Sequence, residues 1–333
     1  MSISAVSSRE FYVGVDVGGS KVAVLVSDDQ GREQGRYVAP TRLDSSRGTL
    51  EGIVDAIHTA LRVAQADLED VAAIGLGIPG RVEPEEGIVH LAVNLSWQNM
   101  PVGQILQEAL GTPCWLENDV RAAALGLQRH PLYAQVQNLA YISIGTGISA
   151  GLILNGRLYR GAHGMAGEIG HMMMLRDGPR CQCGSRGCLE ALASGPAIAR
   201  RGEAILQTGV KTILSEWKPV TTRSVFQAAE AGDAIAQAIL QEVGRYLGQA
   251  LQQMVMAYDV EHIVLGGGVA SAGASLLDYV LTDIKHQREA SSLAKEMLQP
   301  EMFHMQPQNY EAGLWGAVVL AENGLHTMQP LTI

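Results

Sequence analysis

The sequence contains the same layout twice, a strand, a glycine-containing turn and a second strand, and the two turns begin 127 residues apart. The first copy, FYVGVDVGGSKVAVLV, begins at Phe11 and has GGS at residues 18–20. The second copy, LAYISIGTGISAGLIL, begins at Leu139 and has GTG at residues 145–147. This duplication predicts two similar α/β halves around a central cleft, where paired turns hold one ligand from both sides.

Apolar residues in the rest of the chain alternate between helix and strand spacing. A third β run after the first copy completes a three-stranded meander, and a third glycine cluster, IVLGGGVA at residues 263–270, ends another strand. Helices are expected over residues 46–66, 101–110, 120–127, 233–257 and 311–322, with strands over 71–78 and 113–116. Strands that alternate with helices predict an α/β protein.

Composition narrows the function. A chain of 333 residues is long enough for two domains. Its net charge of -10 argues against broad binding to nucleic acid or to a membrane surface, so any phosphate must be held locally. The first ten residues lack the basic and apolar regions of a secretory signal, and no apolar stretch is long enough to span a bilayer. We therefore expect a cytoplasmic protein.

The two turns have residues suited to phosphate. Glycines let backbone N–H groups approach phosphate oxygens, a hydroxyl adds a donor, and an aspartate at a strand end can hold Mg²⁺ or its waters. A plain β-hairpin turn is the alternative for either turn taken alone, and neither the Rossmann nor the P-loop pattern is present in its strand-to-helix context. The candidate phosphate-binding residues are Asp16, Gly18, Gly19, Ser20, Lys21, Gly145, Thr146 and Gly147.

One block of the chain has the spacing of a metal site. His171, Cys181, Cys183 and Cys188 fall within 18 residues, and the glycines and proline between them let the chain fold around an ion. Three thiolates and one imidazole form a closed tetrahedral set that favours Zn²⁺, so the ion is expected to be structural. Cys114 is isolated in an apolar strand and is expected to lie in the core.

The motifs together resemble those of a known family. VGVDVGGSKVAVLV, LGIPGRV, NLSWQN, LENDVRAAALG, ISIGTGISAGLI, GEIGHM and CQCGSRGCLEALASGPAI are similar to the ROK family of sugar kinases and repressors, from about Phe11 to Gly324. The resemblance implies a two-domain actin-like ATPase fold of the ribonuclease H-like type, with the same four zinc ligands. It also implies ATP as phosphoryl donor, and it places ATP at Gly266, Gly267 and Gly268. From the residues alone, a close approach of the chain to a nucleotide and an ordinary strand-to-helix turn stay equally open.

The resemblance also decides the acceptor site. Taken alone, Asn118 and Asp119 suit the N-cap of a helix. Their match to the family motif implies instead that Asp119 is the general base and that Asn118 binds a sugar hydroxyl. For His171 we hypothesise that one ring nitrogen binds zinc and the other faces the sugar. The remaining substrate-binding residues that the resemblance implies are Gly80, Arg81, Asn94, Glu168 and Glu190.

These observations predict an ATP-dependent, glucokinase-like hexose kinase that phosphorylates the 6-hydroxyl. Kinases of N-acetylmannosamine, N-acetylglucosamine or fructose stay open, because one sequence does not display pocket shape. A sugar-sensing repressor would need a DNA-binding module, and only ten residues precede Phe11. A non-catalytic actin-type ATPase would lack the acceptor residues. We expect one domain over residues 1–120 and 306–333, a zinc-containing domain over 121–305, and, from family habit, a homodimer or homotetramer.

Overall fold

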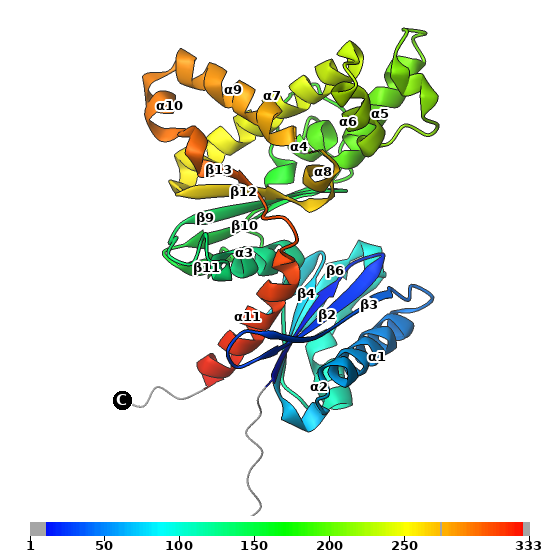
Figure 1. The fold of residues 1–333 in the computed structure, drawn as a ribbon, viewed down its shortest axis with the longest axis vertical. Coiled ribbons are helices and arrows are strands. Elements are labelled where there is room, and N and C mark those ends of the chain that lie inside the picture. The colour runs from blue at the N-terminus through cyan, green and yellow to red at the C-terminus, as the bar shows by residue number, and fades with distance from the viewer. Residues whose placement is uncertain (1–10, 274, 329–333) are drawn as a thin grey trace, which may run out of the picture. The chain divides into compact units, whose positions relative to one another are not determined.

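The computed structural model describes residues 11–273 and 275–328, and their contacts group them into two compact units. Unit 1 contains the described residues up to Gln135, the segment Leu158–Met165 and the described residues from Asn309 onward. Unit 2 contains Val136–Arg157 and the described residues of Ala166–Gln308. The ribbon in Figure 1 follows the chain through both units. Among the described residues, no helix has the length and apolarity needed to cross a bilayer.

Unit 1 is built on a five-stranded sheet in the order β3-β2-β1-β4-β8, and a small sheet in the order β5-β6-β7 follows β4 in the chain. The main sheet begins with an antiparallel meander, and β4 and β8 then extend it in parallel to β1. The strands are β1 (Phe11–Val17), β2 (Lys21–Asp28), β3 (Glu33–Pro40), β4 (Val71–Ile78), β5 (Arg81–Glu83), β6 (Ile88–Ala92), β7 (Trp97–Met100) and β8 (Cys114–Asn118). The helices are α1 (Ser46–Ala64), α2 (Val102–Leu110), α3 (Asp119–Arg129) and α11 (Ala312–Met328), with one-turn 3₁₀ helices η1 (Leu68–Asp70) and η2 (Val93–Leu95).

Alternation along β2 explains how both faces of this sheet are buried. Val22, Val24 and Val26 pack in one core cluster with apolar residues of α1, whereas Ala23 and Leu25 pack with residues of α11 on the other face. Helix α11 also packs along α3, β1 and β4. The C-terminal helix therefore belongs to unit 1.

Two glycines let α11 lie directly on the sheet. A Cβ at Gly14 of β1 would stand 2.6 Å from the carbonyl oxygen of Leu314, and one at Gly75 of β4 would overlap the carbonyl oxygen of Ala317. Any larger residue would force the helix away from the strands. The division expected at residue 120 would put α3 in the second unit, whereas α3 packs along α11 in unit 1.

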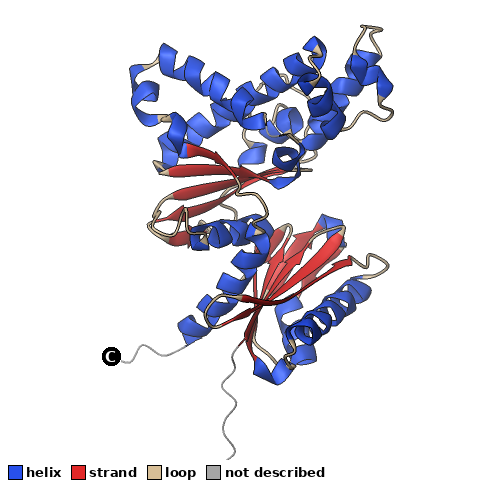
Figure 2. Cartoon of the chain, viewed as in Figure 1, coloured by secondary structure: helices blue, strands red, loops and turns tan. Residues whose placement is uncertain are grey.

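Unit 2 repeats the plan with the sheet order β11-β10-β9-β12-β13, in which β12 runs parallel to β9 and β13 (Figures 1 and 2). The strands of this sheet are β9 (Leu139–Ile144), β10 (Ile148–Leu154), β11 (Arg157–Tyr159), β12 (His262–Gly266) and β13 (Phe303–Met305), and the last two residues of β11 are grouped with unit 1. The helices of unit 2 are α4 (Leu189–Ala193), α5 (Gly195–Leu206), α6 (Thr222–Glu230), α7 (Ala234–Tyr258), α8 (Gly267–Ala272), α9 (Leu276–Ala290) and α10 (Ser292–Met297), and its 3₁₀ helices are η3 (Ile169–His171), η4 (Ile213–Glu216) and η5 (Pro300–Met302). Both sheets thus begin with an antiparallel meander and continue with two parallel strands.

Candidate functional site

Asp119 is the first residue of α3 and directly follows Asn118, the last residue of β8. Asn118 caps this helix, because its Oδ1 accepts from the N–H groups of Val120 at 3.0 Å and Arg121 at 3.2 Å. Its Nδ2 donates to the carbonyl oxygen of Gly80 at 3.1 Å and to Oδ1 of Asp119 at 3.0 Å. The amide of Asn118 therefore uses its full hydrogen-bonding capacity inside unit 1, and a sugar hydroxyl would have to replace one of these partners.

Asp119 is half-buried as a residue, and its carboxyl has an unusual electrostatic environment. Burial raises its pKa, and hydrogen bonds from Val120 N–H and Asn118 together with the charge of Arg121 oppose this rise. Val120 N–H, like the Asn118 amide, donates to Oδ1 at 3.0 Å. Such a carboxylate holds a proton more readily than one in water, which is the property a general base needs.

A second carboxyl, Asp16 at the end of β1, stands near the first. Its pKa is raised to about 6, mainly by burial and then by the charge of Asp119, while Lys21 opposes the rise. Gly77 separates the two acids, because a Cβ there would lie 3.6 Å from the Cα of Asp119 and 3.9 Å from Oδ1 of Asp16. Two neighbouring carboxylates repel each other, so a cation bound between them would stabilise their charged forms.

The first glycine turn joins β1 to β2 beside these acids. The N–H of Gly18 donates to the carbonyl oxygen of Lys21 at 2.8 Å, and the Thr41 hydroxyl donates to Gly18 O at 2.6 Å. A Cβ at Gly19 would lie 3.1 Å from the Cβ of Asn94, so the turn and this predicted sugar ligand are neighbours. Unit 1 thus brings together Asp16, Gly18, Gly19, Ser20, Lys21, Gly80, Asn94, Asn118 and Asp119, with Arg81 exposed on β5 next to Gly80.

The second and third glycine clusters meet in unit 2. Gly267 has φ +85°, and a Cβ there would lie 2.6 Å from the carbonyl oxygen of Ile144, the last residue before the second turn. Its positive φ and this close approach both favour glycine. Nearby, Gly145 N–H donates to Gly147 O at 2.9 Å, and Gly145 O accepts from Gly195 N–H at 2.9 Å. Residues 145–147 and 266–268 therefore form one glycine-lined surface.

Glu190 on α4 connects this surface to the cysteine block. Its Oε2 accepts from the N–H of Ile148 at 3.2 Å, and a Cβ at Gly147 would lie 2.5 Å from the same oxygen. Its Oε1 lies 4.0 Å from Sγ of Cys181. One predicted sugar ligand thus touches both the phosphate-type turn and the candidate metal ligands.

The four predicted metal ligands converge. Their ligand atoms all lie within 4.8 Å of one another, with 3.8 Å between Cys181 Sγ and His171 Nδ1 and 3.7 Å between Cys183 Sγ and Cys188 Sγ. Ligand atoms around a tetrahedral zinc ion are about 3.4–3.8 Å apart, so the set fits this metal. Burial and the neighbouring thiols raise the pKa of Cys188 to about 12. A bound cation would lower this pKa, because it stabilises the thiolate.

The imidazole of His171 has two different neighbours. Its Nδ1 faces the thiols, and its Nε2 lies 3.9 Å from Oε2 of Glu168, whose side chain is about half exposed. A metal on Nδ1 would leave Nε2 as a hydrogen-bond donor directed toward the Glu168 side. This geometry is compatible with the hypothesis that His171 serves both the metal and the sugar.

Sequence analysis missed the partners of Glu117. This carboxylate is fully buried and pairs with Arg121 and Arg160. Arg121 follows Glu117 by four residues, but Glu117 lies on β8 and Arg121 on α3, so the helix pattern of ion pairs did not predict this contact. Arg160 is 43 residues from Glu117 in the sequence, so no local pattern could have shown this contact.

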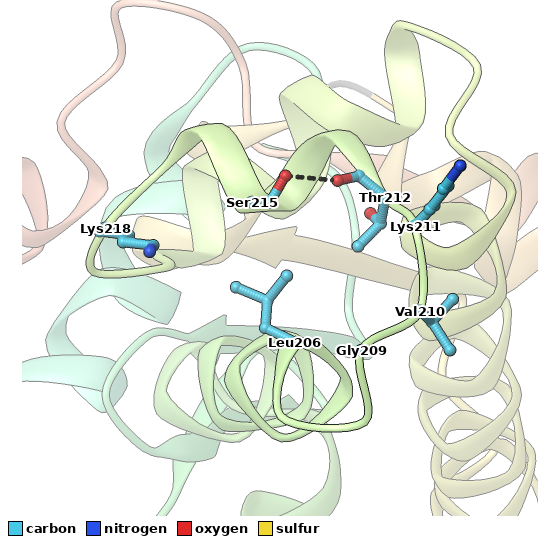
Figure 3. A pocket seen from close by; sticks show the side chains of 7 residues that line it. All are labelled: Leu206, Gly209, Val210, Lys211, Thr212, Ser215 and Lys218. Atoms are coloured by element: carbon cyan, nitrogen blue, oxygen red, sulfur yellow. Dashed lines mark hydrogen bonds between the residues drawn. The ribbon is translucent and has the colours of Figure 1, made fainter.

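A pocket of about 390 Å³ lies in unit 2, near the end of α5 (Figure 3). Its lining is Leu206, Gly209, Val210, Lys211, Thr212, Ser215 and Lys218, none of which is a predicted site residue. The hydroxyl of Thr212 donates to Asp233 and that of Ser215 donates to the carbonyl oxygen of Thr212. Both hydroxyls therefore stabilise the loop itself.

Comparisons with known proteins agree with the motifs. Residues 12–323 match the ROK family. The glucokinase of Halalkalibacterium halodurans is 33% identical over 97% of this chain and 98% of its own length, and the xylose repressor of Caldicellulosiruptor bescii is 30% identical over 83% and 70%. A crystal structure of a ROK family glucokinase from Streptomyces griseus in complex with glucose and AMPPNP is 30% identical, with a TM-score of 0.74 over 94% of this chain and 100% of its own.

Proposed function

Because the chain belongs to the ROK family, we propose that it transfers the γ-phosphoryl group of ATP to a hexose hydroxyl, with Asp119 as general base. The family match, the glucokinase relatives and the solved glucokinase structure confirm three predictions: the family, the actin-like ATPase fold and the class of ATP-dependent sugar kinase. The observation that carries the proposal is the pair of neighbouring carboxyls, Asp119 and Asp16, beside the first glycine turn.

The chemistry of the base follows from its surroundings. Its Oδ1 already accepts from Asn118 and Val120, so we assign Oδ2 to the acceptor hydroxyl. The pKa raised by burial favours proton acceptance, and the charge of Arg121 opposes loss of the ionised form. A base of this kind accelerates a proton transfer by about 10²–10⁴-fold.

The glycine turns supply the phosphate contacts in this proposal. The residues proposed for these contacts are Gly19, Ser20, Lys21, Thr146, Gly147 and the Gly266–Gly268 cluster. Asp16 would hold Mg²⁺ or its waters, and this ion would neutralise charge on the transferred phosphoryl group. Positioning and charge neutralisation account for most of the catalysis of phosphoryl transfer.

The acceptor in this proposal is glucose, phosphorylated at its 6-hydroxyl. The glucokinase relatives support this choice, and Gly80, Arg81, Asn94, Asn118, Glu168, His171 and Glu190 would bind the sugar. A zinc ion held by His171 and the three cysteines would fix the imidazole for the same purpose. An N-acetylated hexosamine or fructose is the alternative acceptor, and the assay below distinguishes them.

The test is ADP formation with and without a panel of hexoses, for the wild type and Asp119→Asn. We expect hexose-dependent ADP formation that the substitution lowers by about 10²–10⁴-fold. Asp67→Asn is the control, because Asp67 also lies at the start of a helical segment, as the N-cap of η1, and is not a predicted site residue. Turnover that is independent of sugar and survives Asp119→Asn would refute the kinase proposal.

A further inference from the structure

Glu117 is a carboxylate buried two residues before the proposed base. Its side chain is 0% exposed, and a buried charge of this kind is stable only when it is paired and hydrogen-bonded. Oε1 accepts from Arg121 Nε at 2.7 Å and from the N–H of Asn118 at 2.8 Å. Oε2 accepts from Arg160 Nε at 2.6 Å. The two oxygens thus have different sets of partners.

The two arginines come from different parts of the chain. Arg121 lies on α3, and its side chain is buried like that of Glu117. Arg160 is 41% exposed and lies in the segment Leu158–Met165, which we call the return segment because the chain joins unit 1 here between two stretches of unit 2. Arg121 Nη1 also donates to the carbonyl oxygen of Gly164 at 2.5 Å. The return segment is therefore fixed to the β8–α3 junction at two points.

These bonds surround Asp119 in the sequence and in space. Glu117 holds the backbone of Asn118 on one side of Asp119 and the side chain of Arg121 on the other. Asn118 in turn donates to Asp119 itself. Rotation of the Glu117 carboxylate would consequently disturb both Asn118 and Arg121, and Arg160 is the partner that fixes its second oxygen.

We propose that Arg160 is a positioning residue, an inference that rests on the proposed kinase function. By fixing the Glu117 carboxylate, it holds Asn118 and Asp119, at the junction of β8 and α3, in their productive geometry. Loss of Arg160 leaves Glu117 paired with Arg121 and Asn118, so the buried charge stays neutralised while the carboxylate gains freedom to turn. A displacement of about 1 Å at a reacting group can cost about 10²-fold in rate.

The experiment compares Arg160→Ala and Arg160→Lys with the wild type in the hexose-dependent ADP assay. We expect Arg160→Ala to lower kcat by about 10–100-fold, with KM for ATP changed less than about threefold. Lysine keeps one charged donor but lacks the planar fork, so Arg160→Lys should recover part of kcat. Because Arg160 is 41% exposed, millimolar guanidinium chloride should restore part of the activity of Arg160→Ala, and equal sodium chloride should not.

Arg129→Ala is the matched control for a purely structural ion pair. Arg129 ends α3, the helix that Asp119 begins, and its Nη1 pairs with Glu322 of α11 at 2.7 Å. We expect Arg129→Ala to lower the melting temperature and to keep the wild-type kcat. The positioning role is overturned if Arg160→Ala behaves in the same way, with a lower melting temperature, an unchanged kcat and no response to guanidinium.

The outcomes separate this inference from the proposed function. If the wild type forms ADP with a hexose and Asp119→Asn does not, the function holds, and full activity of Arg160→Ala then refutes only the role of Arg160. If the wild type shows no hexose-dependent turnover, the proposed function fails and the role of Arg160 fails with it.

Discussion

Burial of the Asp16 side chain destabilises its charged form and also places it where it could hold a cation. Its carboxyl stands against the first turn of α11, where a Cβ at Gly313 would lie 3.1 Å from Oδ2. Burial and the charge of Asp119 raise its pKa to about 6, well above its ordinary value of 3.8. Without a cation, the folded protein is therefore more stable when the Asp16 carboxyl is protonated than when it is charged.

This shift predicts a pH-dependent effect of Asp16→Asn. A raised folded-state pKa means that the native state binds the proton more tightly than the unfolded state, so the contribution of Asp16 to stability falls as pH rises from about 3.8 to about 6. At pH 8 without nucleotide or Mg²⁺, we expect the variant to be more stable than the wild type by on the order of 2 kcal/mol. Urea unfolding of unit 1 at pH 8 and pH 4.5 measures this difference, which should shrink at the lower pH.

Asp29→Asn, at the exposed turn between β2 and β3, is the control. It should give the same stability as the wild type at both pH values. If Asp16→Asn gained nothing at pH 8, or gained more at pH 4.5, the electrostatic account of the acid pair would be wrong.

Among the site residues, the sequence predicted those that lie close together along the chain. His171 and the cysteines converge because C-x-C and a nearby cysteine form one compact block, and the predicted cluster is present. The neighbourhood of Asp16 and Asp119 is different, because it depends on how β1 and β8 flank β4 in the sheet. Arg160 could not be predicted at all, since its contact with Glu117 depends on the path of the return segment.

Among the elements, α11 depends on glycine in the strands beneath it. The backbone of the helix approaches Gly14 of β1 and Gly75 of β4 too closely for any side chain, as the glycine contacts show. The helix also packs along α3, which carries Asp119 at its start. Close packing of α11 therefore supports the element that presents the proposed base.

We predict that Gly75→Ala destabilises unit 1. A Cβ there would overlap the carbonyl oxygen of Ala317 and lie 2.9 Å from the nitrogen of Ala321, and backbone cannot move aside as a flexible side chain can. Overpacking of this kind costs about 1–3 kcal/mol, which chemical denaturation would measure. Gly52→Ala in α1 is the control, because its Cβ would meet only the Arg42 side chain at 3.3 Å, and alanine favours a helix. Equal stability of both variants would contradict the packing argument.

Most elements of the two sheets could be predicted from periodicity, and the small sheet could not. The predicted helix over 46–66 is α1 at Ser46–Ala64, and the predicted strand over 71–78 is β4. Strands β5 to β7 are short, and the apolar residue Leu91 of β6 is exposed, so these strands lack clear alternation. Their pairing depends on tertiary contacts rather than on a local pattern.

For the whole molecule, the repeated strand-turn-strand layout was the strongest signal. It predicted two similar halves, and both sheets do combine a meander with two parallel strands. The order of the elements around them is not fixed by the repeat, because unit 2 has more helices than unit 1 among the described residues. The cytoplasmic location and the homodimer or homotetramer stay predictions.

Metal removal tests the proposed structural role of the cysteine block. We expect elemental analysis to find about one zinc per chain, and Cys183→Ser or a strong chelator to lower both the metal content and the melting temperature of unit 2. Cys114→Ser is the control, because Cys114 lies on β8 outside the block. Less than about half a metal per chain in fully active protein would contradict the four-ligand site.

The central claim is that Asp119 takes the proton of the acceptor hydroxyl, and a crystal structure with a hexose, Mg²⁺ and a non-hydrolysable ATP analogue tests it most directly. We predict that Oδ2 of Asp119 lies within about 2.6–3.2 Å of one sugar hydroxyl, which also faces the terminal phosphate. A complex in which the sugar hydroxyl nearest the phosphate is held by another group, with Asp119 bonded only to its own helix, would contradict the account.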